Sequence, residues 1–438
     1  MDATALAKAI AQGRVTAPAV MDATFARADA QAEMGAVVRL LSPEAIPAPK
    51  PGPFSGVPML AKDLGSHAKG LAPGAGSDAL RARVAEPPHD SDFFGGLRAQ
   101  GLVPIGLSTT PEFGFALSSE PPGQPPALNP FDTCFSAGGS SGGAAAAVAA
   151  GIVAVAHATD AAGSIRVPAA CCGLWGLKPS RGATPMGPDF TNFLMGIAGE
   201  GILARSLRDI ATAFAPIQPQ GRAPEHPRIA MVLPDRCDAI NADATRHAAR
   251  LFEAAGAHVT PCPAPDVLGA EAHTLAGQIL AISLAEWLDA YEIADAEISP
   301  LAAANAALGR AITGPQVFAL SRRIQQISHS AAALFAKTDA ILMPILSGPP
   351  PPLGAFPTDH SDIAGHLAKM EALAPNAALA NIAGLPTLAI PLPTTGPTPT
   401  AVQLIGPHGS DAMLLALAAT ITPPQVPYPA PIAGMPLP

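Results

Sequence analysis

The chain has 438 residues, of which 49% are hydrophobic and 13% charged, and its formal net charge is −9 at pH 7. This length suits one large α/β domain with a substantial core. The negative charge and the lack of a Lys/Arg run argue against nucleic acid or an anionic membrane surface as a partner. No uninterrupted apolar run reaches the roughly 18 residues that a membrane span needs. We therefore expect a soluble protein that binds neither nucleic acid nor membrane.

Cysteine usage and the N-terminus bear on the cellular compartment. There are five cysteines, an odd number, and they include no C-x-x-C pair. This pattern is typical of reduced thiols and favours neither a disulfide framework nor a zinc site. The first residues lack a basic segment followed by an apolar core, so no secretory signal is visible. We expect a cytoplasmic protein without a bound metal.

The first half of the chain alternates helical patterns with short apolar runs. Residues 1–35 have the pattern of two packing helices, with Thr16 placed to cap the second. A proline-rich connector over 42–58 leads into the apolar run 57–61, which ends on Lys62. Further helices are predicted at 90–100 and 144–150, and buried strands at 102–107 and 152–156. The alternation of strand, helix and strand predicts an α/β sheet.

In the second half, the pattern predicts a return to the sheet on either side of a helical segment. Residues 266–337 are helical almost throughout, and residues 423–438 form a proline-rich tail without predicted structure. Strands are predicted at 228–233, 257–261, 339–346, 387–393 and 401–405, and helices at 242–255 and 411–421.

A cluster of glycine and serine at residues 136–143 is the strongest candidate for a functional turn. A phosphate-binding loop is excluded because Ala144 stands where that motif needs lysine. A dinucleotide fingerprint is disfavoured because a proline-rich loop, and no strand, precedes the turn. The run 139–143 matches G-x-S-x-G, which would make Ser141 the nucleophile of an α/β-hydrolase esterase, with an Asp and a His such as His366 or His408 completing its triad. That alternative stays open.

Longer motifs carry a resemblance to a known family. VPMLAKDLG, VPIGLSTTPEFGF, GGSSGG, ATDAAGSIRVPAACCGLWGLKP, GILARSLRDIA and GLPTLAIPLP with AVQLIG occur in this order. With them the chain resembles the amidase signature family. The resemblance implies a single α/β domain over 1–438, with a mixed β-sheet core and helices on both faces. Its parts would be N-terminal helices and connector (1–56), a signature core (57–210), a helical substrate-shaping insertion (266–337), the C-terminal part of the core (338–422) and the tail (423–438).

The same resemblance implies a Ser-Ser-Lys triad. Ser164 stands where the family has its acyl-forming nucleophile, Ser140 where it has a bridging serine with a cis peptide bond, and Lys62 where it has its base. A serine hydroxyl must lose its proton as it attacks, so it needs a base nearby. Lysine can serve only if burial lowers its pKa, and the apolar run before Lys62 favours burial. Taken singly, each residue more often has an ordinary structural role: Ser164 as a turn serine, Lys62 as a surface lysine and Ser140 as a helix N-cap.

Residues around the nucleophile are expected to support it. The backbone N–H groups of Ala161, Ala162, Gly163 and Ser164 are the expected oxyanion site. Here the chain departs from the family, because Ala161-Ala162 stands where a Thr-Gly pair is more frequent, and alanine resists a positive φ.

We expect the other polar and cysteine residues of these motifs to have structural roles. Asp160 and Arg166 are expected to form an ion pair that holds the loop. Ser141 is expected to support the turn by capping or hydrogen bonding. Cys171 and Cys172 are expected to be core residues and not thiol nucleophiles.

These inferences predict an amidase that hydrolyses a linear carboxylic amide through an acyl-enzyme on Ser164, with no cofactor or metal. The alternatives are the glutamine-hydrolysing subunit of a tRNA-dependent amidotransferase, an inactive scaffold member of the family, and the Ser141 esterase. A homodimer is plausible from the family alone. We expect the substrate pocket to be shaped by the 266–337 helices and the loop 344–356, with Phe113, Phe115 and Trp175 as candidate lining residues.

Overall fold

The computed structural model describes residues 2–186, 193–217 and 221–436. Met1, residues 187–192 of the predicted core and the last two residues of the predicted tail lie outside the described residues.

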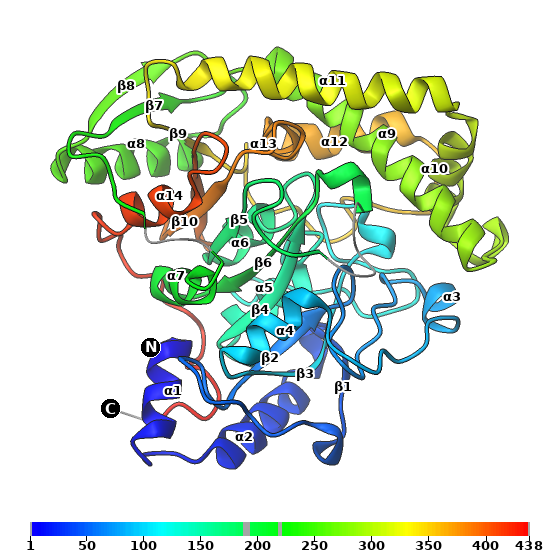
Figure 1. Cartoon of the computed structure of the whole chain (residues 1–438), viewed down its shortest axis with the longest axis vertical. Helices are drawn as coiled ribbons and strands as arrows, with labels where there is room; N and C mark the ends of the chain where they lie inside the picture. The colour runs from blue at the N-terminus through cyan, green and yellow to red at the C-terminus, as the bar shows by residue number, and fades with distance from the viewer. Residues whose placement is uncertain (1, 187–192, 218–220, 437–438) are drawn as a thin grey trace.

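One mixed β-sheet organises the described chain, with the strand order β1-β3-β2-β4-β6-β5-β10-β11-β9-β7-β8 (Figure 1). Strands β2, β3 and β4 run parallel to one another, whereas β6, β5, β10 and β11 pair antiparallel with their neighbours. This confirms the α/β class with a mixed sheet. The strands are β1 (Val37–Leu40), β2 (Val57–Lys62), β3 (Leu102–Ser108), β4 (Val155–Asp160), β5 (Trp175–Lys178), β6 (Gly199–Ala204), β7 (Arg228–Val232), β8 (His258–Cys262), β9 (Ala340–Pro344), β10 (Thr387–Leu392) and β11 (Thr400–Ile405).

Helices cover the sheet on both faces (Figure 1). They are α1 (Ala3–Ala11), α2 (Ala17–Ala30), α3 (Asp78–Arg81), α4 (Asp92–Ala99), α5 (Gly142–Ala149), α6 (Arg166–Cys172), α7 (Leu207–Phe214), α8 (Ala239–Ala254), α9 (Asp266–Ala290), α10 (Pro300–Ala311), α11 (Gly314–Ala332), α12 (Ile363–Leu373), α13 (Ala377–Ile382) and α14 (Asp411–Ala418).

The alternation of side chains along β2 sets the two faces apart. Met59 and Ala61 pack into the core cluster that contains Phe94 of α4, whereas Leu60 packs into the cluster formed with α5 and α6. Successive side chains of a strand point to opposite faces. Lys62 therefore follows Leu60 toward the face that α5 covers.

Several predicted elements are confirmed, and one strand needs correction. Thr16 caps α2 by accepting a hydrogen bond from the Ala19 N–H at 3.2 Å. The strand predicted at 152–156 instead runs over β4, Val155–Asp160. The N–H groups of Ile152 and Val153 donate back to the Ala147 carbonyl at the end of α5, so the chain is still turning there.

The helix α9 stands out by length and apolar composition. Among the described helices it alone meets the length and hydropathy of a membrane span, and 50% of its most apolar stretch is buried inside the protein. It packs against α10, α11, α12 and α13, and Leu275, Ile279 and Leu288 lie in the core cluster on this side of the molecule.

The tight start of α5 generates a prediction on stability. A Cβ at Gly143 would lie 2.2 Å from the Thr109 backbone nitrogen and 2.7 Å from the Ala36 carbonyl oxygen, both of them main-chain atoms that cannot yield easily. We expect Gly143→Ala to lower the melting temperature strongly or to abolish folding. Gly96→Ala is the control, because Gly96 is an exposed position of α4 and a Cβ there meets nothing within 4 Å. It should stabilise the protein by about 0.5–1 kcal/mol, and a Gly143→Ala protein as stable as wild type would contradict the packing described.

Candidate active site

Lys62 is the last residue of β2 and is fully buried, with 0% of its surface exposed. Its Nζ donates hydrogen bonds to Ser140 Oγ at 2.7 Å and to Thr159 Oγ1 at 2.9 Å. Parallel pairing of β2 with β4 brings the carboxyl ends of both strands to the same edge of the sheet, which is why Lys62 meets Thr159.

Burial sets the protonation of this amine. Desolvation disfavours the ammonium form, and it lowers the pKa of Lys62 to about 7, although the negative charges of Glu200 and Asp160 act in the opposite direction. An amine with this pKa exists in both protonation states near neutral pH, so it can accept and return a proton.

The turn that carries Ser140 is held by the Ser119 side chain and by close packing at Gly139. The Gly139–Ser140 peptide bond is cis. The Ser140 carbonyl accepts a hydrogen bond from Ser119 Oγ at 3.1 Å, and the same hydroxyl accepts one from the Gly142 N–H at 2.9 Å. Glycine is required at 139, because a Cβ there would lie 2.6 Å from the Ser118 backbone nitrogen. These contacts fix the Ser140 hydroxyl in front of Lys62.

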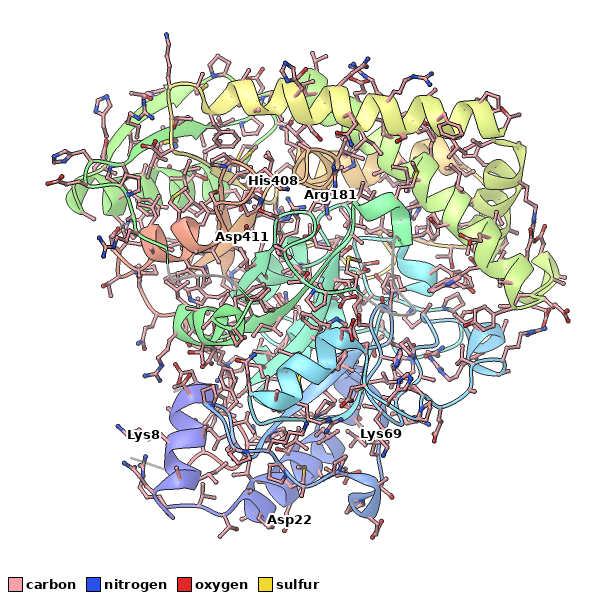
Figure 2. The ribbon with its side chains drawn as sticks, in the orientation of Figure 1. Lys8, Asp22, Lys69, Arg181, His408 and Asp411 are labelled. Carbon is pink, nitrogen blue, oxygen red and sulfur yellow. The ribbon has the colours of Figure 1, made fainter. Side chains whose placement is uncertain are left out.

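Ser141 lies away from the cavity and serves the turn. Its side chain is fully buried, and its Oγ donates to the Thr159 carbonyl at 3.3 Å while accepting from the Thr159 N–H at 3.4 Å. The histidines considered as partners bond elsewhere. His366 Nε2 lies 2.8 Å from the Phe115 carbonyl. His408 Nε2 lies 3.3 Å from the Arg181 carbonyl (Figure 2). The structure therefore does not assemble the Ser141 esterase triad.

A buried ion pair organises the loop that presents Ser164. Arg166 Nε and Nη2 donate to the two carboxylate oxygens of Asp160, each at 2.9 Å, and both residues have no exposed surface. Asp160 Oδ1 also accepts the Gly163 N–H at 2.7 Å, and Arg166 Nη2 donates to Asn381 Oδ1 at 2.7 Å. The charge of Arg166 opposes the effect of burial and holds the pKa of Asp160 well below its usual range. The geometry is that of the structural pair expected from the sequence.

The expected oxyanion donors divide into two groups. The Gly163 N–H was expected to be an oxyanion donor, but it already donates a hydrogen bond to Asp160 within the loop. Within the described residues, no hydrogen bond engages the N–H groups of Ala161, Ala162 or Ser164. Neither alanine is among the described residues with a positive φ, whereas Gly163 has a φ of 120°. Alanine therefore imposes no backbone strain at these positions, and the left-handed position of the loop is held by glycine.

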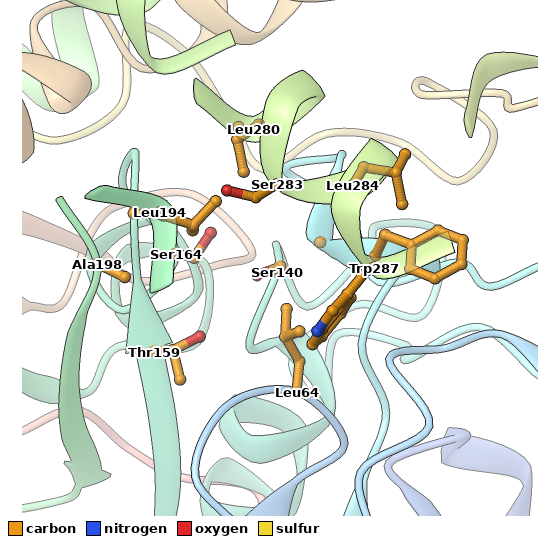
Figure 3. Close-up of a pocket in the computed structure, with 13 residues that line it drawn as sticks. Leu64, Ser140, Thr159, Ser164, Leu194, Ala198, Leu280, Ser283, Leu284 and Trp287 are labelled. Carbon is orange, nitrogen blue, oxygen red and sulfur yellow. The ribbon is translucent and has the colours of Figure 1, made fainter. Parts of the chain in front are cut away.

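A cavity opens where these elements meet, and Ser140, Thr159 and Ser164 share it (Figure 3). It encloses about 490 Å³, its open mouth included. In the described part of the chain its lining contains no charged side chain and is mainly apolar: Leu64, Phe113, Gly114, Ser140, Thr159, Ala161, Ser164, Leu194, Ala198, Leu280, Ser283, Leu284 and Trp287. The three hydroxyls lie on the sheet side, and α9 supplies the opposite wall.

The lining corrects part of the sequence analysis. Phe113 lines the cavity as expected, whereas Phe115 and Trp175 are not among its lining residues and are buried in core clusters. The 344–356 loop contributes no lining residue. Thr159 was missed although it directly precedes Asp160, and Ser283 and Trp287 of α9 carry no sequence signal at all.

The remaining candidates for chemistry lie outside the cavity. Cys171 and Cys172 are fully buried, and burial raises the pKa of both thiols well above the ordinary value, so neither resembles an activated nucleophile. Within the described residues, no group of three or more His, Cys, Asp or Glu side chains could hold a metal ion.

Known proteins resemble this chain over almost its full length. The family model for amidases matches residues 19–236 and 217–415. A Mycobacterium tuberculosis protein named as an amidase, AmiC, is 32% identical over 449 residues, which cover 95% of this chain and 93% of that protein. The 6-aminohexanoate-cyclic-dimer hydrolase of Paenarthrobacter ureafaciens is 35% identical over 215 residues, or 48% of this chain and 44% of that enzyme. A solved structure of a 6-aminohexanoate cyclic dimer hydrolase superposes with a TM-score of 0.86 at 27% identity, covering 96% of each chain.

Together, the mixed sheet and these matches define the class as amidase-signature hydrolases. The chain belongs to the amidase family. It is an amidase, a hydrolase that acts on amide C–N bonds.

The Asp160–Arg166 pair generates a prediction on stability and pH. Arg166→Met leaves the buried Asp160 carboxylate without its cation, which should cost about 3–5 kcal/mol in the free energy of unfolding. Adding Asp160→Asn should recover part of this loss. Because the folded-state pKa of Asp160 is depressed, the ion pair stabilises at pH values above the ordinary aspartate pKa of about 3.9, and this contribution is lost on acidification. Urea unfolding between pH 3 and 7 checks this, and a deficit independent of pH would contradict it.

Proposed function

We propose that the amidase reaction proceeds through an acyl-enzyme on Ser164, with Ser140 as proton relay and Lys62 as general base. The observation that carries this proposal is the 2.7 Å hydrogen bond between Lys62 Nζ and Ser140 Oγ at the floor of a cavity that Ser164 also lines. The lowered pKa of Lys62, about 7, supports the role of base.

The proton and bond changes follow from this arrangement. As Ser164 Oγ bonds to the carbonyl carbon, its proton passes to Ser140 Oγ, and the Ser140 proton passes to neutral Lys62. The amide C–N bond then breaks as Lys62, through Ser140, returns a proton to the leaving nitrogen, and ammonia or an amine departs. Water repeats the attack on the ester, which yields the acid and restores Ser164.

The loop after β4 supports the charge that forms on the carbonyl oxygen. We assign the N–H groups of Ala161, Ala162 and Ser164 as the donors, because none of them has a hydrogen-bond partner among the described residues, whereas the Gly163 N–H donates to Asp160. Asp160, Arg166 and Ser141 position this loop and the turn without contacting the substrate.

The cavity favours an uncharged amide with an apolar acyl group. Its described lining offers leucines, Phe113 and Trp287, and no charged side chain. A glutamine substrate brings an ammonium and a carboxylate, and burying them unpaired would be costly. The amidotransferase alternative is therefore disfavoured. The names of the similar hydrolases, which act on a cyclic dimer of 6-aminohexanoate, agree with an amide flanked by methylene chains.

The setting of the reaction completes the proposal. We propose that the enzyme works in the cytoplasm on a small-molecule amide, without a metal, an organic cofactor, nucleic acid or a membrane. A homodimer is the assembly that the family resemblance favours, and sedimentation velocity would test it.

The triad generates a prediction on activity. Ser164→Ala should abolish both amide hydrolysis and acyl transfer to hydroxylamine, because no acyl-enzyme can form. Lys62→Met should lower kcat/KM by at least about 100-fold, the usual contribution of a general base. Both can be measured by ammonia release and hydroxamate formation on a panel of aliphatic and aryl amides.

The controls are matched substitutions outside the cavity. Ser328→Ala removes a hydroxyl of α11 that donates hydrogen bonds to the carbonyls of Ile324 and Ile382. Lys8→Met removes an exposed amine. Both should keep wild-type activity. Full hydrolysis by a folded Ser164→Ala protein would overturn the assignment of the nucleophile, and inactivity of the wild type toward every amide would favour the scaffold alternative.

The apolar lining generates a prediction on specificity. Hexanamide should have a kcat/KM at least tenfold above that of glutamine. Glutamine must bury charged groups and makes fewer apolar contacts, and a difference of about 1.4 kcal/mol already gives this ratio. Trp287→Ala should reduce kcat/KM for hexanamide more than for acetamide. Equal loss on both amides, or a preference for glutamine, would contradict the proposed substrate class.

A further inference from the structure

A buried pair of side chains lies beneath Lys62, on the sheet face opposite α5. His157 of β4 packs its ring against Phe93 and Phe94 of α4, with ring centroids 5.4 Å and 4.9 Å away. Its Nε2 is hydrogen bonded to Glu200 Oε2 of the neighbouring strand β6. Both side chains are fully buried, and neither lines the cavity.

Hydrogen bonding fixes the orientation and tautomer of this pair. The Lys62 backbone N–H donates to His157 Nδ1 at 3.1 Å, so Nδ1 carries the lone pair. The ring proton therefore lies on Nε2 and is donated to the Glu200 carboxylate. The other carboxylate oxygen of Glu200 accepts the Ser66 N–H at 3.0 Å. Glu200 is thus held at both oxygens, and His157 ties it to the main chain of the proposed base.

Glu200 differs from the other carboxylates around Lys62 in its partners. Asp160 is paired with Arg166, and Asp63 is paired with Arg81 at 2.8 Å. The buried Lys178 Nζ donates to the Pro179 carbonyl, and its charge acts mainly with Asp160, Arg166, Asp411 and Arg181. Among the described residues, no lysine or arginine forms an ion pair with Glu200. Of the three carboxylates Asp63, Asp160 and Glu200, only Glu200 has no arginine partner in the described part of the chain.

We propose that Glu200, oriented by His157, is the electrostatic positioning residue that keeps Lys62 basic enough to take the serine proton, whereas burial keeps the ammonium acidic enough to return it. This inference rests on the proposed role of Lys62 as the base. Burial alone would make the amine too weak a base to draw the proton from a hydroxyl. A fixed carboxylate that cannot reach the substrate counters this effect without competing for the reaction.

The pH dependence of kcat/KM tests this inference. In the wild type, the acid limb of the profile should have its midpoint near 7, where Lys62 loses its proton. Glu200→Gln removes the negative charge that stabilises the ammonium, so the pKa of Lys62 falls and the midpoint should move down by about one pH unit. Glu200→Asp keeps the charge but withdraws it by one methylene, so its midpoint should lie between the other two. The maximal kcat should be highest in the wild type, lower in Glu200→Asp and lowest in Glu200→Gln, with KM nearly unchanged.

A matched control separates tuning from general loss of stability. Asp209→Asn also neutralises a buried carboxylate, one that accepts the N–H groups of Ala3 and Thr4 at 2.8 Å and 2.9 Å. It should lower the melting temperature and leave the midpoint in place. If Glu200→Gln does not fold, the downward shift in Glu200→Asp decides the question.

Failure of this inference can be told apart from failure of the proposed function. A wild-type profile without an acid limb near 7, or an active Lys62→Met enzyme, overturns the role of Lys62 itself. An acid limb that Lys62→Met abolishes, yet whose midpoint is the same in the wild type and the folded Glu200 variants, overturns the role of Glu200 alone.

Discussion

The burial of one amine is the constraint on which the site depends. Lys62 ends a strand with no exposed residue, and its Nζ has only the hydroxyls of Ser140 and Thr159 as hydrogen-bond partners among the described residues. An ammonium in this position is destabilised by desolvation, and the free energy spent on burial appears as a pKa of about 7. The desolvation that makes the Lys62 ammonium costly to bury also makes the neutral amine available as a base.

The surrounding structure can be understood as two supports for this amine. On the α5 side, glycines at 139 and 142 admit a tight turn that aims the Ser140 hydroxyl at Nζ. On the α4 side, Glu200 and His157 lie below the backbone of Lys62. The Asp160–Arg166 pair then holds the loop that presents Ser164 to the same cavity. His157 and Asp160 lie on β4 and Glu200 lies on β6, so the site depends on the register of these two strands with each other and with β2.

The sequence carried much of the fold and the identity of the candidate residues, because both lie in local patterns. An apolar run predicted β3, a second apolar run marked the residues that form β2, and the motifs around Lys62, Ser140 and Ser164 supported the family resemblance. The short β5 and the glycine-containing β6 lacked a strand signal, since glycine and charged residues are depleted in strands. The role of Glu200 was hidden for the same reason, as only the pairing of β4 with β6 brings it to His157. The sequence did predict that the 266–337 helices shape the pocket, and α9 of that segment lines it. Which α9 side chains reach the cavity, and the use of the Gly163 N–H by Asp160, depend on tertiary contacts.

The most direct test of the account is a titration of Lys62 itself, by carbon NMR of protein labelled at the lysine Cε positions. The Lys62 resonance is assigned by its loss in Lys62→Met, which also separates it from the other buried lysine, Lys178. The account predicts a midpoint near 7 for Lys62. A midpoint at the ordinary lysine value of about 10.4 would show that the amine is charged at neutral pH, and would contradict its role as the base.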